Sequence, residues 1–339
     1  MADHRYDYIE TGSLVSINRN VRDILIPSEE RRIAMHPMDF EEFLWAMGDE
    51  MTMPFIRECF RKGVPMGPMH RKTMTLFRQY MLVGGMPQAV QKYVDTRSFA
   101  AADTVKRDIL NLYRSDIHKY AIGYESKVLK IFDELPGQLQ KHEKKFRLSA
   151  LGAGARFRSY ESSFVWLDES RVVNICHRAT EPTVGLRMRQ DDATMKLYMA
   201  DTGLLVTAAF AVGKHTHEEL YAKILLGKLE INEGMFVENI VAQMLRSSGN
   251  ELFFFSSYSK TDASETMEVD FLMAKPEITS RHNVRPIEVK SSTRYTIGSL
   301  NKFIAKYGQQ VDTAYVVHGN DYEKRDGIIY LPLYMTGCL

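Results

Sequence analysis

The feature that most constrains the fold is the order of helix-like and strand-like segments in the last third of the chain. Residues 235–247 place Phe236, Ile240 and Met244 three to four positions apart, which is the spacing of an amphipathic helix. A second helix is predicted at 299–307. Runs of β-branched and aromatic residues predict strands at 252–257, 267–274, 284–290, 313–318 and 328–333. An order of helix, three strands, helix and two strands predicts an α/β fold.

Three carboxylates and a lysine fall on this pattern at positions where they can meet. Glu288 and Lys290 are two residues apart on one predicted strand and therefore share a face. Asp270 lies on the preceding strand, and Glu238 on the helix before it. Clustered carboxylates are costly without a cation, and oxygen ligands select Mg²⁺ or Mn²⁺. The alternative is that Glu288 and Lys290 form an exposed ion pair on an edge strand.

A metal ion at this position has a defined chemical use. Asp270, Glu288 and Glu238 are the predicted ligands of Mg²⁺ or Mn²⁺, which polarises a phosphodiester and generates hydroxide. Lys290 is expected to orient the water or to stabilise developing charge. The runs Glu268-Val269-Asp270 and Glu288-Val289-Lys290 resemble the PD-(D/E)XK nuclease superfamily, with Val269 in place of its proline. The resemblance implies a restriction-endonuclease-like α/β domain with Asp270, Glu288, Lys290 and Glu238 as catalytic residues.

The middle of the chain has a different pattern. Short helical pieces around 149–152 and 159–168 precede strand-like runs at 171–177 and 183–199, with turn residues at 189–192. Helices followed by a two-stranded hairpin are typical of a winged helix, whose third helix can enter a DNA major groove or pack against a neighbour. If DNA binds, the expected phosphate contacts are Arg156, Arg158, Arg187 and Arg189, although the outward Glu161 does not favour phosphate.

Three longer segments carry a second resemblance. Tyr8-Ile-Glu-Thr-Gly-Ser-Leu14, Met35-His-Pro-Met-Asp-Phe-Glu-Glu-Phe-Leu44 and Lys196-Leu-Tyr-Met-Ala-Asp-Thr-Gly-Leu-Leu205 look like bacterial and archaeal AAA-type ATPases. That family joins a P-loop ATPase domain to a helical lid, a winged helix and a nuclease-like domain. The resemblance implies an α/β multi-domain protein with an ATPase remnant at 1–48, a lid at 49–95, a winged helix at 96–205 and a PD-(D/E)XK domain at 206–339.

The same resemblance implies a nucleotide-sensing role for Thr11 or Ser13. Neither the phosphate-binding loop G-x-x-x-x-G-K-[ST] nor an acidic Mg²⁺-binding strand precedes them in the sequence. ATP is therefore expected to bind only a longer, full-length parent protein, and the chain alone is not expected to hydrolyse it.

Composition limits the remaining classes. The 44 lysine and arginine residues against 43 acidic residues give a net charge of +1, so no overall field indicates nucleic acid or membrane. The longest apolar stretch, 203–212, is too short to span a bilayer, so a cytoplasmic protein without membrane partners is expected. Trp45 and Trp166 are predicted to lie in the core.

Two functional hypotheses follow. The first is a metal-dependent nuclease-like domain of an AAA-type ATPase that acts on nucleic acid. The second is a non-catalytic module that binds DNA or a protein partner, or that self-associates.

Overall fold

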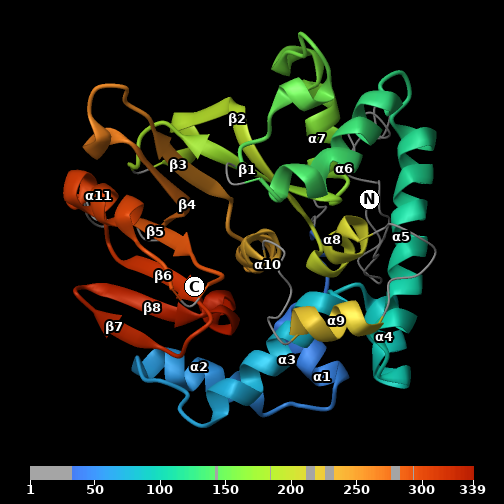
Figure 1. Cartoon of the computed structure of the whole chain (residues 1–339), viewed down its shortest axis with the longest axis horizontal. Coiled ribbons are helices and arrows are strands. Elements are labelled where there is room, and N and C mark those ends of the chain that lie inside the picture. The colour runs from blue at the N-terminus through green and yellow to red at the C-terminus, as the bar shows by residue number, and fades with distance from the viewer. Residues whose placement is uncertain are drawn as a thin grey trace, which may run out of the picture.

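The computed structural model describes residues 33–141, 144–183, 185–210, 218–225, 233–275, 283–292 and 294–339. A helical N-terminal part leads into a mixed sheet of eight strands (Figure 1). In Figure 1 strands β3 to β8 lie on the left and helices α4 to α9 toward the right, with α10 between them and α1 to α3 along the bottom. None of the helices in the described ranges is long and apolar enough to cross a bilayer.

The helical part is built from amphipathic segments, as the spacing of apolar residues at 71–83 and 96–120 predicts. The first helix is capped by Asp39 and Glu42, each of which accepts a hydrogen bond from the other's backbone amide. The helices are α1 (Phe40–Ala46), α2 (Thr52–Lys62), α3 (Met69–Val83), α4 (Pro87–Thr96), α5 (Phe99–Tyr120), α6 (Glu125–Leu139), α7 (Glu161–Glu169), α8 (Thr202–Ala209), α9 (Glu218–Leu225), α10 (Gly234–Ser247) and α11 (Gly298–Tyr307).

The strands form one sheet in the order β2-β1-β3-β4-β5-β6-β8-β7. Their bounds are β1 (Val173–Ala179), β2 (Gln190–Met199), β3 (Phe253–Ser257), β4 (Met267–Ala274), β5 (Val284–Val289), β6 (Ala314–His318), β7 (Glu323–Arg325) and β8 (Ile328–Pro332). Helix α10, strands β3 to β6, helix α11 and strand β8 confirm the predicted order in the last third of the chain. The short edge strand β7 was not predicted, because its three charged residues carry no strand pattern.

The predicted hairpin of the middle segment belongs to this same sheet. Strands β1 and β2 pair in antiparallel fashion, and β1 also pairs with β3 in parallel. The sheet therefore crosses the domain boundary predicted at 205/206. The predicted turn at 189–192 is wrong, because β2 begins at Gln190 and its first residues pair with the end of β1. Ladder hydrogen bonds outweigh the turn propensity of Asp191 and Asp192.

Helices pack against both faces of the sheet. Phe254 and Phe271 lie in the large core cluster that includes α10, whereas Phe255 and Val269 pack with Phe303 of α11 in a second cluster. Register with β3 shifts within β4, so Asp270 and Phe271 together stand opposite Phe254. This bulge interrupts the alternation of side chains next to the predicted site, which is a common place for bulges.

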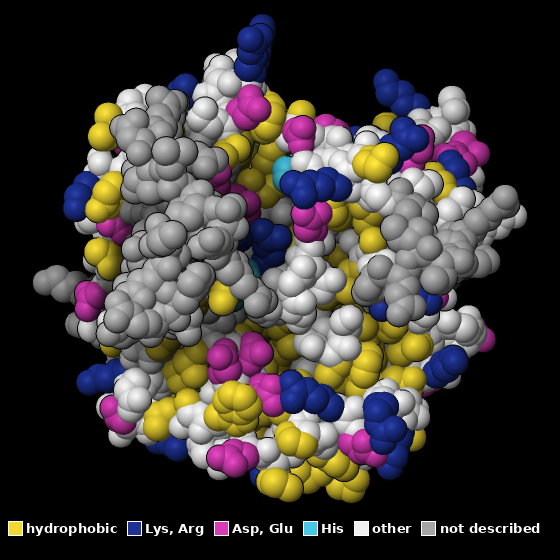
Figure 2. All heavy atoms as spheres, turned by 180° about the vertical axis from the view of Figure 1, so that it is seen from behind, with side chains coloured by type: hydrophobic (Ala, Val, Ile, Leu, Met, Phe, Trp, Pro, Cys, Tyr) yellow, Lys and Arg dark blue, Asp and Glu magenta, His cyan; other side chains and the backbone are white. Residues whose placement is uncertain are grey.

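The two tryptophans differ in burial. Trp166 is 2% exposed and lies in the core as predicted, but Trp45 is 53% exposed. Trp45 lies on the outer side of α1, whose inner side buries Phe43 and Leu44. Figure 2 shows hydrophobic side chains at the lower end of the molecule, where Figure 1 has α1 to α3.

Gly203 gives a test of how closely α8 approaches the end of α3. A Cβ atom at this position would lie 2.4 Å from the Val83 carbonyl oxygen and 2.5 Å from the Gly84 nitrogen. We expect Gly203→Ala to lower the free energy of unfolding by on the order of 3 kcal/mol, because backbone atoms must move. Gly137→Ala in α6 is the control, since open space surrounds that position. Urea denaturation of both variants checks the difference, and equal stabilities would contradict the close approach.

Candidate functional site

Helix α10 carries a stripe of buried polar side chains, Glu238, Asn239 and Gln243. The Asn239 side chain accepts a hydrogen bond from the Met199 amide at 2.8 Å and donates one to the Met199 carbonyl at 3.0 Å. Gln243 Oε1 accepts from the amide and the hydroxyl of Thr202 at 2.8 and 2.9 Å. The end of β2 and the start of α8 are therefore fixed to α10 by side chains that form hydrogen bonds with backbone groups.

Lys196 of β2 lies at the centre of a carboxylate cluster. Its Nζ atom is 3.3 Å from Glu238 Oε1, 3.0 Å from Glu268 Oε1 and 3.5 Å from Asp270 Oδ1. The ammonium group also lies 5.1 Å from the centre of the Phe254 ring. Its side chain is 1% exposed, so this charge depends on the carboxylates rather than on water.

Two further lysines surround the same carboxylates. Lys144 forms an ion pair with Glu238 Oε2 and donates to the Gly234 carbonyl at 3.2 Å. Lys145 lies 3.2 Å from Glu268 Oε2. The Tyr198 hydroxyl donates a hydrogen bond to Glu238 Oε1. Both oxygens of Glu238 are thus engaged by protein groups in the wild-type structure.

Glu288 and Lys290 form a separate ion pair. Lys290 Nζ lies 2.7 Å from Glu288 Oε1, which confirms that the two side chains lie together. Asp270 Oδ2 accepts a hydrogen bond from the Val289 amide at 2.8 Å, so it bridges β4 and β5. Glu288 pairs in register with Val316, which packs in the cluster that includes α11. No ion pair joins Glu288 to Lys196, so the three predicted carboxylates do not surround one common cation.

The pKa values of Glu238, Glu268 and Lys196 reflect this mutual neutralisation. Burial acts to raise the pKa of Glu238, but Lys144 and Lys196 outweigh it and lower the pKa to about 2. Burial likewise opposes ionisation of Glu268, whose pKa is nevertheless lowered by Lys196 and Lys145. For Lys196, burial acts to lower the pKa, and the three carboxylates raise it well above its usual value. All three groups are therefore charged at neutral pH.

Asp270 and Glu288 shift in the opposite direction. Burial and the charge of Glu238 raise the pKa of Asp270, against the effect of Lys196. Burial and the charge of Asp270 raise the pKa of Glu288 to about 8, although Lys290 opposes this. Both carboxyls therefore keep their protons to a higher pH than an exposed side chain does.

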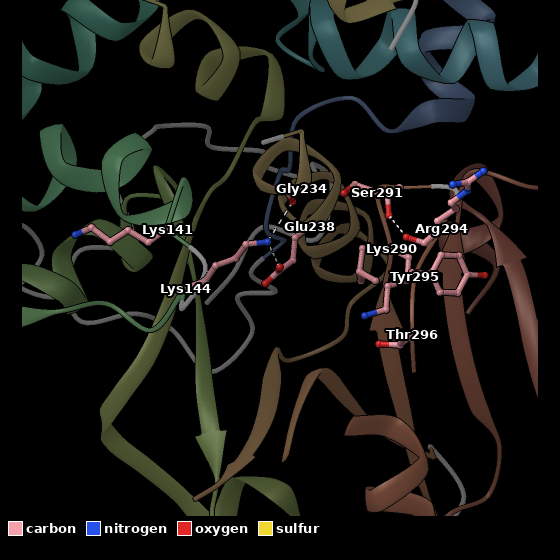
Figure 3. A pocket seen from close by; sticks show the side chains of 11 residues that line it. Lys141, Lys144, Gly234, Glu238, Lys290, Ser291, Arg294, Tyr295 and Thr296 are labelled. Carbon is pink, nitrogen blue, oxygen red and sulfur yellow. Dashed lines mark hydrogen bonds and ion pairs between the residues drawn. The ribbon is translucent and has the colours of Figure 1, made fainter. Parts of the chain in front are cut away.

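A cavity of about 330 Å³ adjoins the cluster. Lys144 and Glu238 line one side, and Lys290, Arg294 and Tyr295 line the other (Figure 3). Figure 3 shows Lys144 reaching toward Glu238 and the Gly234 carbonyl, and Lys141 pointing away from the other labelled side chains. The cavity is lined by more lysine and arginine than acidic side chains, so it suits an anionic group better than a cation.

Protein groups bind two of the predicted metal ligands in the structure. Within the part of the chain that the structure describes, no group of three or more histidine, cysteine, aspartate or glutamate side chains is arranged to hold a metal ion. Glu238 is bound by Lys144, Lys196 and Tyr198, and Asp270 contacts Lys196. The predicted nucleotide-sensing residues Thr11 and Ser13 lie outside the described residues.

The four predicted DNA contacts fall into two pairs. Arg156 and Arg158, in the segment before α7, are exposed and form no ion pair within the described ranges. Arg187 lies 3.2 Å from Glu251, and Arg189 lies 3.4 Å from Glu181, so both are partly neutralised. Glu161 is exposed, as the sequence predicts. Arg156 and Arg158 are therefore the stronger candidates for a phosphate contact.

Five residues that build the cluster were not among the predicted site residues: Lys196, Tyr198, Glu268, Lys144 and Lys145. A signal for three of them was present. Lys196 and Tyr198 begin the segment 196–205, which was noted only for its resemblance, and Glu268 is two residues from Asp270 on the same strand. Lys144 and Lys145 carried no signal, because they lie outside the predicted strands and helices.

Comparison with known families gives two matches. Residues 74–215 match the family described as Domain of unknown function (DUF8612), and residues 233–335 match the one described as Domain of unknown function (DUF4143). The second is a domain found in AAA-ATPase-associated proteins, which gives this chain a broad link to such proteins. Searches of curated proteins and of solved structures found no match.

Glu288 provides a test of the electrostatics through pH. Its pKa is about 8 in the folded protein and near 4.5 when unfolded, so the folded state binds more protons between these values. The stability contributed by the protonated group is present below pH 4.5 and is lost as pH rises through 8, with each pKa unit equivalent to about 1.4 kcal/mol. We expect Glu288→Gln to gain stability relative to the wild type as pH rises from 5 to about 8.5.

The measurement is thermal unfolding in EDTA across that pH range. Glu268→Gln is the matched control, since the pKa of Glu268 is lowered and its titration lies below this window. Its stability difference from the wild type is expected to stay constant. A flat difference for Glu288→Gln would show that Glu288 is ionised throughout.

Proposed function

We propose that this chain is a non-catalytic binding module of an AAA-ATPase-associated protein, with nucleic acid as its ligand. In this proposal the C-terminal part keeps a PD-(D/E)XK-like arrangement, and its carboxylates are neutralised by lysines instead of metal. The observation that carries the proposal is the position of the Lys196 ammonium, within 3.5 Å of Glu238, Glu268 and Asp270.

The charges of the cluster support a non-catalytic role. The four carboxylates each have a lysine within 3.5 Å, and the four lysines are Lys144, Lys145, Lys196 and Lys290. A divalent cation entering this cluster would meet at least as much positive as negative charge, because the raised pKa of Glu288 leaves that carboxyl largely protonated at neutral pH. It would also have to displace Lys196, which has almost no access to water. The free energy that usually draws Mg²⁺ to clustered carboxylates is therefore largely removed.

The binding role is supported by features around the sheet. The order α10, β3, β4, β5, α11, β6 is that of the nuclease-like fold the sequence predicts. Helix α7 followed by the β1–β2 hairpin has the order of a winged helix, although the hairpin is also part of the sheet. Arg156 and Arg158 lie just before α7, exposed and without acidic partners in the described ranges. Exposed arginines of this kind bind phosphates without reading sequence.

One observation favours a second candidate function, a metal-dependent nuclease. Glu288 Oε2 is buried and has no hydrogen-bond partner within the described residues. A buried carboxylate oxygen without a partner is costly, and either a proton or a cation relieves the cost. In this second candidate Asp270 and Glu288 would hold the ion, and Lys290 would remain beside it.

DNA binding by the full 339-residue chain tests the proposal. We expect a labelled duplex to bind with a log K that falls steeply with log salt, because the contacts release counterions from phosphates. The double variant Arg156→Ala/Arg158→Ala should weaken binding and reduce the salt slope by about 2. Fluorescence anisotropy measures both quantities. Arg114→Ala is the control, since Arg114 is paired with Asp133 in the helical part.

Two outcomes would contradict the proposal. Absence of binding at low salt would remove nucleic acid as the ligand. Cleavage of the duplex in Mg²⁺ or Mn²⁺ that disappears in Asp270→Asn would instead support the second candidate.

A further inference from the structure

We infer that the Lys196 ammonium takes the place of a divalent cation in this cluster, and that its removal opens a divalent-cation site made by Glu238, Glu268 and Asp270. The inference deepens the proposed function, since it rests on the non-catalytic reading of the same cluster. It adds a statement about which single side chain determines whether the cluster binds metal.

The geometry around the Lys196 nitrogen is that of a cation cradle. One oxygen from each of three carboxylates lies 3.0 to 3.5 Å from a single point. Two of them, on Glu268 and Asp270, come from one side of the bulged strand β4, and the third comes from α10. The Phe254 ring closes another side at 5.1 Å. The cradle is therefore formed by rigid elements and not by loops.

The distances fit an ammonium group and are too long for a metal ion in the wild type. Ca²⁺ binds oxygen at about 2.3–2.6 Å, and Mg²⁺ at about 2.1 Å with strict geometry. The three oxygens would therefore have to move inward by up to about 1 Å for Ca²⁺. Removal of the lysine side chain leaves space for this contraction or for bridging water. Ca²⁺ and Mn²⁺ tolerate such irregular sites better than Mg²⁺.

Charge provides the driving force in the variant. Lys144 and Lys145 still face Glu238 and Glu268 when Lys196 is removed. Asp270 then loses its ion-pair partner in the described part of the chain and keeps the Val289 amide. The buried Glu238 and the partly buried Glu268 and Asp270 then share two lysines, and this unbalanced charge is costly until a cation enters.

A purely structural ion pair leads to a different expectation. If Lys196 only holds β2 against α10, its loss destabilises the protein, and no added cation restores the loss. The inference requires that divalent cations restore stability in the variant and have no effect on the wild type. The two readings are therefore separated by the response to metal and not by the loss of stability itself.

The experiment is thermal unfolding of the full chain in EDTA and in millimolar Ca²⁺ or Mn²⁺. We expect the melting temperature of the wild type to change by less than about one degree. We expect Lys196→Ala to melt lower than the wild type in EDTA and to rise by several degrees with Ca²⁺ or Mn²⁺, as mass action requires for a ligand of the folded state. The double variant Lys196→Ala/Asp270→Asn should lose this rise.

Control variants distinguish cation binding at the Lys196 position from a general effect of losing a lysine. Lys145→Ala removes a lysine from the same cluster at its more exposed side, and we expect no metal-dependent rise for it. Lys196→Gln, which keeps a hydrogen-bond donor, replaces Lys196→Ala if the alanine variant does not fold. If neither variant folds in EDTA, refolding in Ca²⁺ or Mn²⁺ is the readout. Recovery of folded protein supports the inference, and failure to recover counts against it.

Two results would overturn the inference. One is binding of Ca²⁺ or Mn²⁺ to the wild type, measured by isothermal titration and lost in Asp270→Asn. The other is a folded Lys196 variant that shows no response to either cation. The DNA-binding experiment is independent of these outcomes. A chain that does not bind DNA, but gains a metal site on loss of Lys196, would remove the proposed ligand and leave this inference standing.

Discussion

The packing of α10 against the segment 196–202 is the interaction on which the rest of the structure depends. A helix buried between a sheet and a helical layer has to satisfy every polar group it carries, because water does not reach them. Asn239 and Gln243 do so by binding the backbone at Met199 and Thr202. Glu238 does so through Lys196, Lys144 and Tyr198. The same helix therefore joins the sheet to the helical part.

This arrangement explains the residues found in the segment 196–205. Lys196 supplies the central charge. Asp201 Oδ1 accepts the Leu204 amide to begin α8, while its Oδ2 accepts the Gly85 amide beyond the end of α3. Gly203 allows α8 to lie against the Val83 carbonyl. One short segment thus contributes an ion, a helix cap and a close backbone contact to three neighbouring elements.

The functional consequence is that a cluster of carboxylates need not bind a metal ion, because lysines can supply the opposing charge. Asp270 and Glu288 lie on the successive strands β4 and β5, and Lys290 directly follows β5. The match over 233–335 gives a broad link to AAA-ATPase-associated proteins. The charge that accompanies these residues comes from lysines on β2 and in the segment after α6. Those lysines lie more than 70 residues from Asp270 in the sequence. A motif restricted to strands β4 and β5 contains no information about them.

The sequence by itself determined the elements of the C-terminal part, because apolar periodicity is a local property. Strand β4 and helices α10 and α11 follow from it almost residue by residue, as does the pairing of Glu288 in β5 with Lys290, which directly follows that strand. Only the tertiary structure decided that the β1–β2 hairpin extends the sheet past β3, and that Lys196 lies among Glu238, Glu268 and Asp270. Strand partners and buried counter-charges are non-local, so they depend on which distant segments fold together.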